Sequence, residues 1–137
     1  MESTLKNQFV EIIYSAMNNL VLQTWLTSSS HMCELEFRRQ IELLFGFVDF
    51  FQPEAVYIDA SEFCYYINEK AVQLINQYLQ KCKIISFGLV ISSALLGKEY
   101  IKKMVREVPG KNLKLFKTRN EGKSWLSSNF GLNNQEN

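Results

Sequence analysis

Alternation of apolar and polar residues marks two short segments near the start of the chain. Residues 9–14 (FVEIIY) and 20–26 (LVLQTWL) are rich in β-branched and aromatic side chains, which favour strands. Asn18 and Asn19 lie between these segments and are typical of a tight turn. The pattern therefore predicts a hairpin.

A helical period replaces this alternation after a cluster of serines at residues 28–30. Apolar side chains then recur every three or four residues, at Phe37, Ile41, Leu44, Val48 and Phe51. Serine is a common residue at the start of a helix, and proline disfavours a helical conformation of the residue before it. We therefore expect one amphipathic helix that begins after the serines and ends before Pro53.

Short apolar runs and amphipathic runs alternate through the middle of the chain. Residues 54–60 (EAVYIDA) and 84–91 (IISFGLVI) are predicted to be buried strands. Asn68 lies between them, before a run with helical spacing, and asparagine is a strong N-cap residue. The pattern predicts a strand, a helix capped by Asn68, and a second strand.

A third helix is predicted after the strand at residues 84–91. Ser92 or Ser93 is expected to cap this helix, because serine accepts hydrogen bonds from the free amides of a first turn. Pro109 and Gly110 are expected to stop it.

One more strand and one more helix are predicted near the end of the chain. Lysines alternate with apolar residues in residues 113–117 (LKLFK), which is typical of a strand near the edge of a sheet. Thr118 and Glu121 have the spacing of a capping box. They predict a short final helix that contains Trp125.

The predicted order of elements is β-β-α-β-α-β-α-β-α. Strands that alternate with helices form right-handed crossovers and pair in parallel. We therefore predict one α/β domain in residues 1–127, with a mixed, mostly parallel sheet, an N-terminal hairpin and helices packed on the sheet. Residues 128–137 are expected to form a polar C-terminal tail.

Composition agrees with one globular domain and argues against several classes of protein. The chain has 137 residues, and 47% of them are hydrophobic, which is enough for a sizeable core. Fifteen Lys and Arg residues face 14 Asp and Glu residues, and this balance argues against a nucleic-acid partner, which requires a basic surface. No apolar run approaches the ~20 residues of a membrane-spanning helix.

The cysteine pattern and the N-terminus predict a cytoplasmic location. Cys33, Cys64 and Cys82 have no CxxC spacing, so we expect reduced thiols and no disulfide framework. The first residues lack the basic and apolar regions of a signal peptide.

Several local features together resemble a known family. The segment VYIDA ends in Asp59 and is followed by the loop SEFCYYI, and a polar residue, Asn68, begins the next helix. The strand IISFGLVI and a final helix that contains Trp125 and Leu126 follow in the same order. In these features the sequence resembles the SpoIIAA-like group of the STAS (sulfate transporter and anti-sigma antagonist) family, over about residues 7–127.

The STAS resemblance implies a regulatory protein that binds other proteins and has no enzymatic activity. In anti-sigma antagonists of this family, the helix after the third strand opens with an Asp-Ser-Ser/Thr-Gly motif that a kinase phosphorylates. Residues 66–70 (YINEK) occupy the corresponding stretch and contain no serine, threonine or glycine. The usual phosphorylatable residue is therefore absent from that position.

Polar residues collect where the predicted parallel strands end, which is where ligands bind in open α/β sheets. Asp59 and Ser61 follow one strand, and Ser92 and Ser93 follow the next. For Asp59 we favour the ordering of its own loop by hydrogen bonds to backbone N–H groups. For the two serines we favour helix capping, because the chain contains no glycine-rich phosphate motif.

The loop after the third predicted strand is rich in aromatic residues. Phe63, Tyr65 and Tyr66 either contact a ligand or partner, or they fill the core, and the pattern does not decide between these alternatives. A pocket of roughly a few hundred Å³ beneath this loop, lined by Tyr65, Tyr66 and Phe87, would indicate a site for a small apolar or anionic molecule.

Catalytic and metal-binding residue sets are incomplete. His31 is the only histidine, and nothing in the sequence places it beside Asp59 or Ser61 to form a triad. Zinc requires three or four ligands, and His31 with Cys33 supplies two. We therefore predict no catalytic residue, no metal and no cofactor.

Two functions remain open. We expect a non-enzymatic cytoplasmic regulatory module that binds a protein partner or forms a homodimer, using the loops at the strand ends and the helix that begins at Asn68. The abundance of aromatic residues, 13%, is compatible with an interface. The alternative is a protein that binds a small molecule beneath the aromatic loop.

Overall fold

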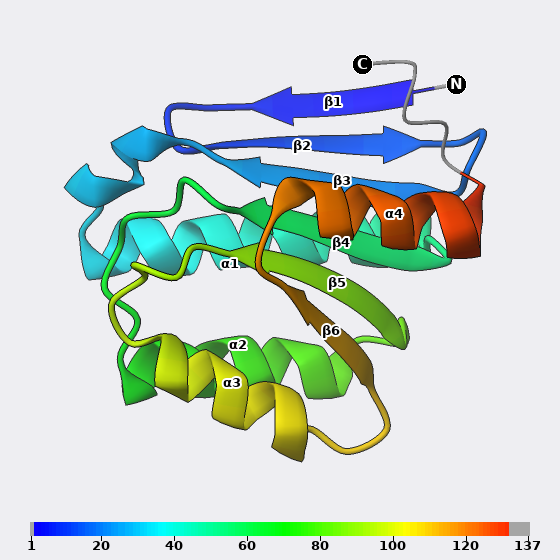
Figure 1. Ribbon diagram of the computed structural model, residues 1–137. Coiled ribbons are helices and arrows are strands. Elements are labelled where there is room, and N and C mark those ends of the chain that lie inside the picture. Colours follow the sequence, from blue (N-terminus) through cyan, green and yellow to red (C-terminus); the bar gives the residue numbers. More distant parts are fainter. Residues whose placement is uncertain (1, 132–137) are drawn as a thin grey trace.

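The computed structural model describes residues 2–131, which form six strands and four α-helices (Figure 1). The strands are β1 (Glu2–Lys6), β2 (Val10–Ser15), β3 (Leu20–Trp25), β4 (Ala55–Ala60), β5 (Ser86–Ile91) and β6 (Asn112–Phe116). The helices are α1 (Glu34–Phe51), α2 (Glu69–Lys81), α3 (Lys98–Glu107) and α4 (Arg119–Phe130), and a short 3-10 helix, η1 (Thr27–His31), precedes α1. The predicted α/β class is confirmed.

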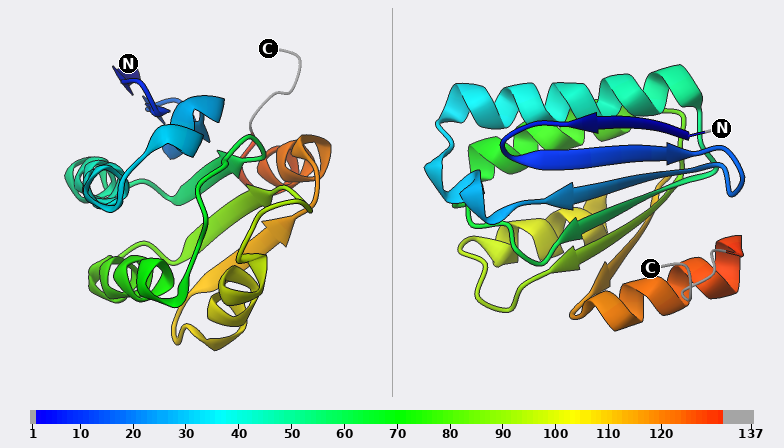
Figure 2. Two further views of the ribbon diagram at one scale, coloured as in Figure 1. Left: turned by 90° about the vertical axis from the view of Figure 1, so that its left-hand side faces the viewer. Right: turned by 90° about the horizontal axis from the view of Figure 1, so that it is seen from above.

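All six strands lie in one sheet, in the order in which they occur in the chain. β1, β2 and β3 are antiparallel neighbours, whereas β3, β4, β5 and β6 are parallel. Right-handed crossovers that all advance in one direction place their helices on the same face of a sheet. Accordingly, α1, α2 and α3 cover one face, and α4 lies on the other (Figure 1 and Figure 2).

The N-terminal hairpin is confirmed, and it has one strand more than predicted. Ile13 in β2 lies opposite Leu22 in β3, with Asn19 in a left-handed conformation between the strands. β1 pairs with the outer edge of β2. Its residues are half-buried or exposed, and Leu5 is the one large apolar residue among them. An edge strand of this composition has no clear apolar period, which is why the pattern does not reveal it.

Two predicted helix starts agree with the structure. The Asn68 side chain caps α2, since its Oδ1 atom accepts a 2.8 Å hydrogen bond from the N–H of Ala71. Thr118 and Glu121 form the predicted capping box of α4. In both cases the cap and the amide that it satisfies lie within three residues, so local sequence is enough to predict them.

The predicted start of the third helix was wrong. Ser92 Oγ accepts a 3.1 Å hydrogen bond from the N–H of Ala94 within a turn, and α3 begins only after Gly97. Gly97 has a φ of +87°, and a β-carbon there would overlap the carbonyl oxygen of Ile67. The helix therefore begins at a glycine that has no side-chain cap, and both its positive φ and its close approach to Ile67 require glycine there.

The final helix is longer than predicted. α4 continues to Phe130, so residues 128–130, which the sequence pattern placed in a polar tail, are helical. Gly131 ends the helix in a left-handed conformation, and residues 132–137 of the predicted tail lie outside the described residues. No helix within residues 2–131 combines the length and the apolar character needed to cross a membrane.

Apolar side chains are buried on both faces of the sheet. The larger cluster lies between the sheet and α1–α3 and includes Val21, Phe37 and Ile101. The smaller cluster lies beneath α4 and includes Tyr57 and Leu126. This arrangement explains the continuous apolar runs of β4 and β5, which are covered on both faces.

Candidate functional site

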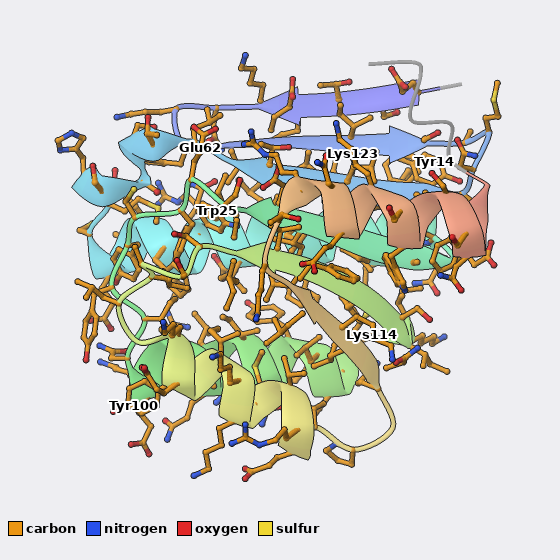
Figure 3. The ribbon with its side chains drawn as sticks, in the orientation of Figure 1. Tyr14, Trp25, Glu62, Tyr100, Lys114 and Lys123 are labelled. Atoms are coloured by element: carbon orange, nitrogen blue, oxygen red, sulfur yellow. The ribbon has the colours of Figure 1, made fainter. Side chains whose placement is uncertain are left out.

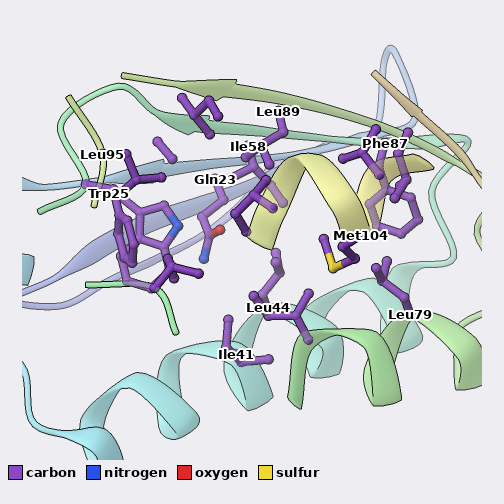
Figure 4. Close-up of a pocket in the computed structure, with 18 of the residues that line it drawn as sticks. Gln23, Trp25, Ile41, Leu44, Ile58, Leu79, Phe87, Leu89, Leu95 and Met104 are labelled. Carbon is purple, nitrogen blue, oxygen red and sulfur yellow. The ribbon is translucent and has the colours of Figure 1, made fainter. Parts of the chain in front are cut away.

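An internal cavity lies within the larger cluster, between the sheet and helices α1, α2 and α3 (Figure 4). Its volume is about 90 Å³. Native cores contain few voids larger than a water molecule. The cavity is larger than one water molecule needs but smaller than the roughly 300–1,000 Å³ of most ligand pockets, so it is a candidate site for a very small molecule.

Apolar side chains from strands β3–β6 and helices α1–α3 form the walls of the cavity. Trp25 comes from β3, Leu44 from α1, Leu89 from β5 and Met104 from α3 (Figure 4). Lys114 in β6 also borders the cavity. Because side chains alternate along a strand, the exposed Lys114 side chain points to the opposite face of the sheet from Leu113 and Leu115. The walls of the cavity are therefore almost entirely apolar.

Gln23 is the exception to these apolar walls. It lies in β3, only 1% exposed, and its amide points into the space between the sheet and α1 (Figure 4). Neither its Nε2 nor its Oε1 atom has a hydrogen-bond partner among the described residues. The sequence contained a signal for this residue, because Gln23 shares one face of the strand with the apolar Val21 and Trp25.

Two loops at the carboxyl ends of the parallel strands close one end of the cavity. Phe63 and Ile67 line it from the loop after β4, and Leu95 lines it from the loop after β5. The N–H of Ile67 donates a 3.0 Å hydrogen bond to the carbonyl of Leu96, which joins the two loops.

Most of the predicted aromatic cluster fills the core. The Phe63 ring meets Trp25 edge to face at 4.6 Å, and the Tyr65 ring stacks on Phe37 at 4.8 Å. Tyr66 is different, because it is 51% exposed. Of the three residues predicted to line a pocket, Phe87 lines the cavity, whereas Tyr65 and Tyr66 do not.

Asp59 and Ser61 are brought together, as predicted, in a loop-ordering role. Asp59 Oδ1 accepts hydrogen bonds from the N–H and the hydroxyl of Ser61, at 3.0 and 2.6 Å. Its Oδ2 atom accepts a 2.7 Å hydrogen bond from Arg119 Nε, and Arg119 also bonds Glu62. Sequence reasoning missed Arg119, which lies 60 residues from Asp59 in the chain. Each of these polar groups has a protein partner, and the arrangement holds the start of α4 against the loop.

Ser92 and Ser93 lie beside a surface groove of about 380 Å³ near the ends of β5 and β6. Lys98, Lys102 and Lys117 also line it. The Lys98 ammonium group already has a partner in the protein, since its Nζ atom donates a 2.7 Å hydrogen bond to the Ser93 carbonyl. The groove is basic and open.

Groups with a metal-binding or nucleophilic character are dispersed. Among residues 2–131, no three His, Cys, Asp or Glu side chains gather in a way that could hold a metal ion. His31 is exposed at the end of η1 and bonds neither Asp59 nor Ser61. All three cysteines are free, and burial raises the pKa of the Cys82 thiol.

The cavity, with Gln23 inside it, is thus the site with the clearest capacity to bind a ligand. Comparisons of the chain with protein-family models, with curated proteins and with solved structures found no match.

Proposed function

We propose that this protein is a cytoplasmic carrier or sensor that binds a small, largely apolar molecule in the cavity between the sheet and α1–α3. The observation that carries the proposal is an apolar cavity of about 90 Å³ with an unpartnered amide, Gln23, inside it. Apolar walls supply affinity through burial, and a few polar groups supply orientation.

A cavity weakens the packing of the side chains around it, and a bound ligand would restore those contacts. Residual cavities destabilise proteins by about 24 cal/mol per Å³, so a cavity of 90 Å³ corresponds to about 2 kcal/mol. That is a large fraction of the stability of an ordinary domain. A molecule that fills this space regains the lost contacts and stabilises the folded state by mass action.

The volume also limits the size of the ligand. An apolar cavity of about 150 Å³ holds one benzene molecule. The cavity of this protein is smaller, so its ligand is a compact molecule with fewer atoms than benzene, unless lining side chains such as Met104 move. We expect short, branched or unbranched aliphatic compounds with one polar group.

Native mass spectrometry of gently purified protein tests this proposal. The wild type is expected to carry a reproducible extra mass and to lose it in Leu89→Phe, which places a ring in the cavity. Leu22→Phe is the matched control, because Leu22 packs in the cluster beneath α4. Xenon, which occupies apolar cavities, serves as a second ligand in solution NMR. A wild type that carries no extra mass and binds no xenon contradicts the proposal.

A protein-interaction module of the STAS kind is the second candidate. It is favoured by Tyr66 and Leu96, which are 51% and 67% exposed on the two loops that the Ile67–Leu96 hydrogen bond joins. Tyr100 is exposed on α3 and, with Glu62, lies toward the edge where β3, β4 and β5 end (Figure 3). On this reading the protein forms a homodimer through these loops. The double variant Tyr66→Ser and Leu96→Ser is then monomeric in analytical ultracentrifugation, whereas the wild type is a dimer.

A further inference from the structure

We infer that the ligand of the internal cavity carries a neutral group that presents a hydrogen-bond donor and an acceptor side by side, and that this group pairs with the side-chain amide of Gln23. Primary amides, lactams and protonated carboxylic acids belong to this class. The inference rests on the proposed function, because it specifies the chemistry of the molecule that the cavity holds.

The position of Gln23 directs its amide toward a ligand. In the sheet it lies between Ile12 in β2 and Ile58 in β4, so its neighbours on both sides are apolar. The amide extends from the sheet toward Ile41 and Leu44 of α1 (Figure 4). Both of its polar atoms are buried and have no hydrogen-bond partner within residues 2–131. A buried amide that lacks partners is unfavourable unless something in the cavity supplies them.

Other buried polar residues show how this fold normally treats such groups. Gln40 accepts a 2.9 Å hydrogen bond from Asn7, and Ser29 accepts one of 2.9 Å from the N–H of Cys64. The Tyr57 hydroxyl is also unpartnered, but it packs against Gly122 beneath α4, away from the cavity. Asn76 has one unpartnered atom, its Oδ1, and does not line the cavity. Among the described residues, Gln23 alone combines two unpartnered atoms with an adjacent cavity.

The two free atoms of Gln23 define the complementary group. Its N–H donates and its carbonyl oxygen accepts, at neighbouring positions of one planar amide. A ligand amide or carboxylic acid in the cis arrangement satisfies both atoms with two parallel hydrogen bonds. A ketone or an ether satisfies only the N–H and leaves the Gln23 carbonyl unpaired. An ionised carboxylate is disfavoured, because the apolar walls provide no compensating charge.

Two compounds of the same shape distinguish a ligand that pairs with both atoms of the Gln23 amide from one that pairs only with its N–H. Propionamide and butanone differ only in the replacement of NH₂ by CH₃, so both fill the cavity equally and only propionamide donates a hydrogen bond. We expect propionamide to bind about tenfold more tightly than butanone in NMR titrations, as one additional buried hydrogen bond predicts. The side-chain NH₂ resonances of Gln23 are expected to shift with propionamide.

Variants of Gln23 complete the test. In Gln23→Leu the two compounds are expected to bind with similar affinity. Gln23→Met is expected to give the same result, and because its side chain is unbranched like that of glutamine, it controls for a change in packing caused by the branched leucine. The inference is overturned if butanone binds the wild type as tightly as propionamide, or if Gln23→Leu and Gln23→Met keep the preference for the amide. In either case, if xenon and butanone bind to the wild type, the proposed function of the cavity as a binding site is still supported. Failure of xenon, propionamide and butanone to bind overturns both.

Discussion

The Nε–H of Arg119, the first residue of α4, donates a 2.7 Å hydrogen bond to the carboxylate of Asp59, near the end of β4. A second 2.7 Å hydrogen bond runs from Arg119 to Glu62 in the following loop. Hydrogen bonds to Glu62 and Asp59 raise the pKa of the guanidinium. One side chain thereby ties the C-terminal helix to the loop that also closes the cavity.

Replacement of Arg119 by methionine is expected to lower the free energy of unfolding by about 1 kcal/mol, because Arg119 is half-exposed and its ion pairs are partly screened by solvent. Lys123→Met is the control, since Lys123 lies on the same helix and forms no ion pair with any residue in 2–131. Chemical denaturation at low and high salt measures both. An equal loss in the two variants contradicts a specific role for Arg119.

Gln23→Leu is expected to stabilise the ligand-free protein by about 1–3 kcal/mol, because it removes a buried amide that has no hydrogen-bond partner in the described part of the chain. Gln40→Leu is the matched control and is expected to destabilise by about 1 kcal/mol, because Asn7 loses its acceptor. Urea denaturation of both variants provides the comparison. If the Gln23→Leu variant is less stable than the wild type, internal solvent already satisfies the amide.

Gly97→Ala is expected to destabilise the protein by about 1–3 kcal/mol through its positive φ alone, and by more through overlap with the Ile67 carbonyl. Gly110→Ala isolates the first effect, because Gly110 also has a positive φ but its β-carbon would meet open space. The difference between the two variants in thermal unfolding measures the contact between the loops. If Gly97→Ala and Gly110→Ala lower the stability equally, the Ile67 carbonyl moves away from the new β-carbon at no cost in free energy.

Asn68→Ala is expected to lower stability by about 1 kcal/mol, because the N–H of Ala71 loses its acceptor at the start of α2. Gln73→Ala, at an exposed position of the same helix, is expected to change stability by less than about 0.5 kcal/mol. If Asn68→Ala leaves stability unchanged and weakens binding to a partner, Asn68 has a functional role beyond capping.

Alkaline pH is expected to destabilise the fold through Tyr57. Burial, with the negative charge of Asp59, raises the pKa of the Tyr57 phenol from 10.0 to about 12. Between pH 10.0 and about 12 the folded protein keeps the Tyr57 proton, whereas the unfolded chain loses it. The stability that the protonated phenol contributes is therefore fully present below pH 10.0 and is lost as the pH rises to about 12. The expected slope is about 1.4 kcal/mol per pH unit.

Tyr57→Phe is expected to flatten that slope, measured by urea denaturation at a series of alkaline pH values. Tyr66→Phe, which removes an exposed phenol, is the control. An unchanged pH dependence in Tyr57→Phe would assign the alkaline loss of stability to other groups.

Local signals were sufficient for most of the fold. The hairpin turn at Asn18 and Asn19, and the caps at Asn68 and Thr118, depend on residues a few positions apart. β1 was missed because its one large apolar residue, Leu5, gives no alternation, and the strand exists by pairing with β2.

The site was harder to predict than the fold. Phe87 was correctly placed beside a pocket, but Tyr65 stacks on Phe37, a contact that no period in the sequence indicates. A cavity arises where side chains from several elements fail to fill a space, so it depends on their combined shapes. Gln23 was visible as a polar residue on an apolar face, yet only the packed structure shows that its amide has no partner.

The strand order of the sheet has a consequence for how the protein is made. Every strand pairs with its neighbours in the chain, so each new strand can dock on an edge that is already present while synthesis continues. The cavity walls come from β3 through β6, and the space is therefore enclosed only when the last third of the chain has emerged. Until α3 and β6 are in place, the apolar side chains that β3, β4 and β5 contribute to the cavity are exposed to solvent.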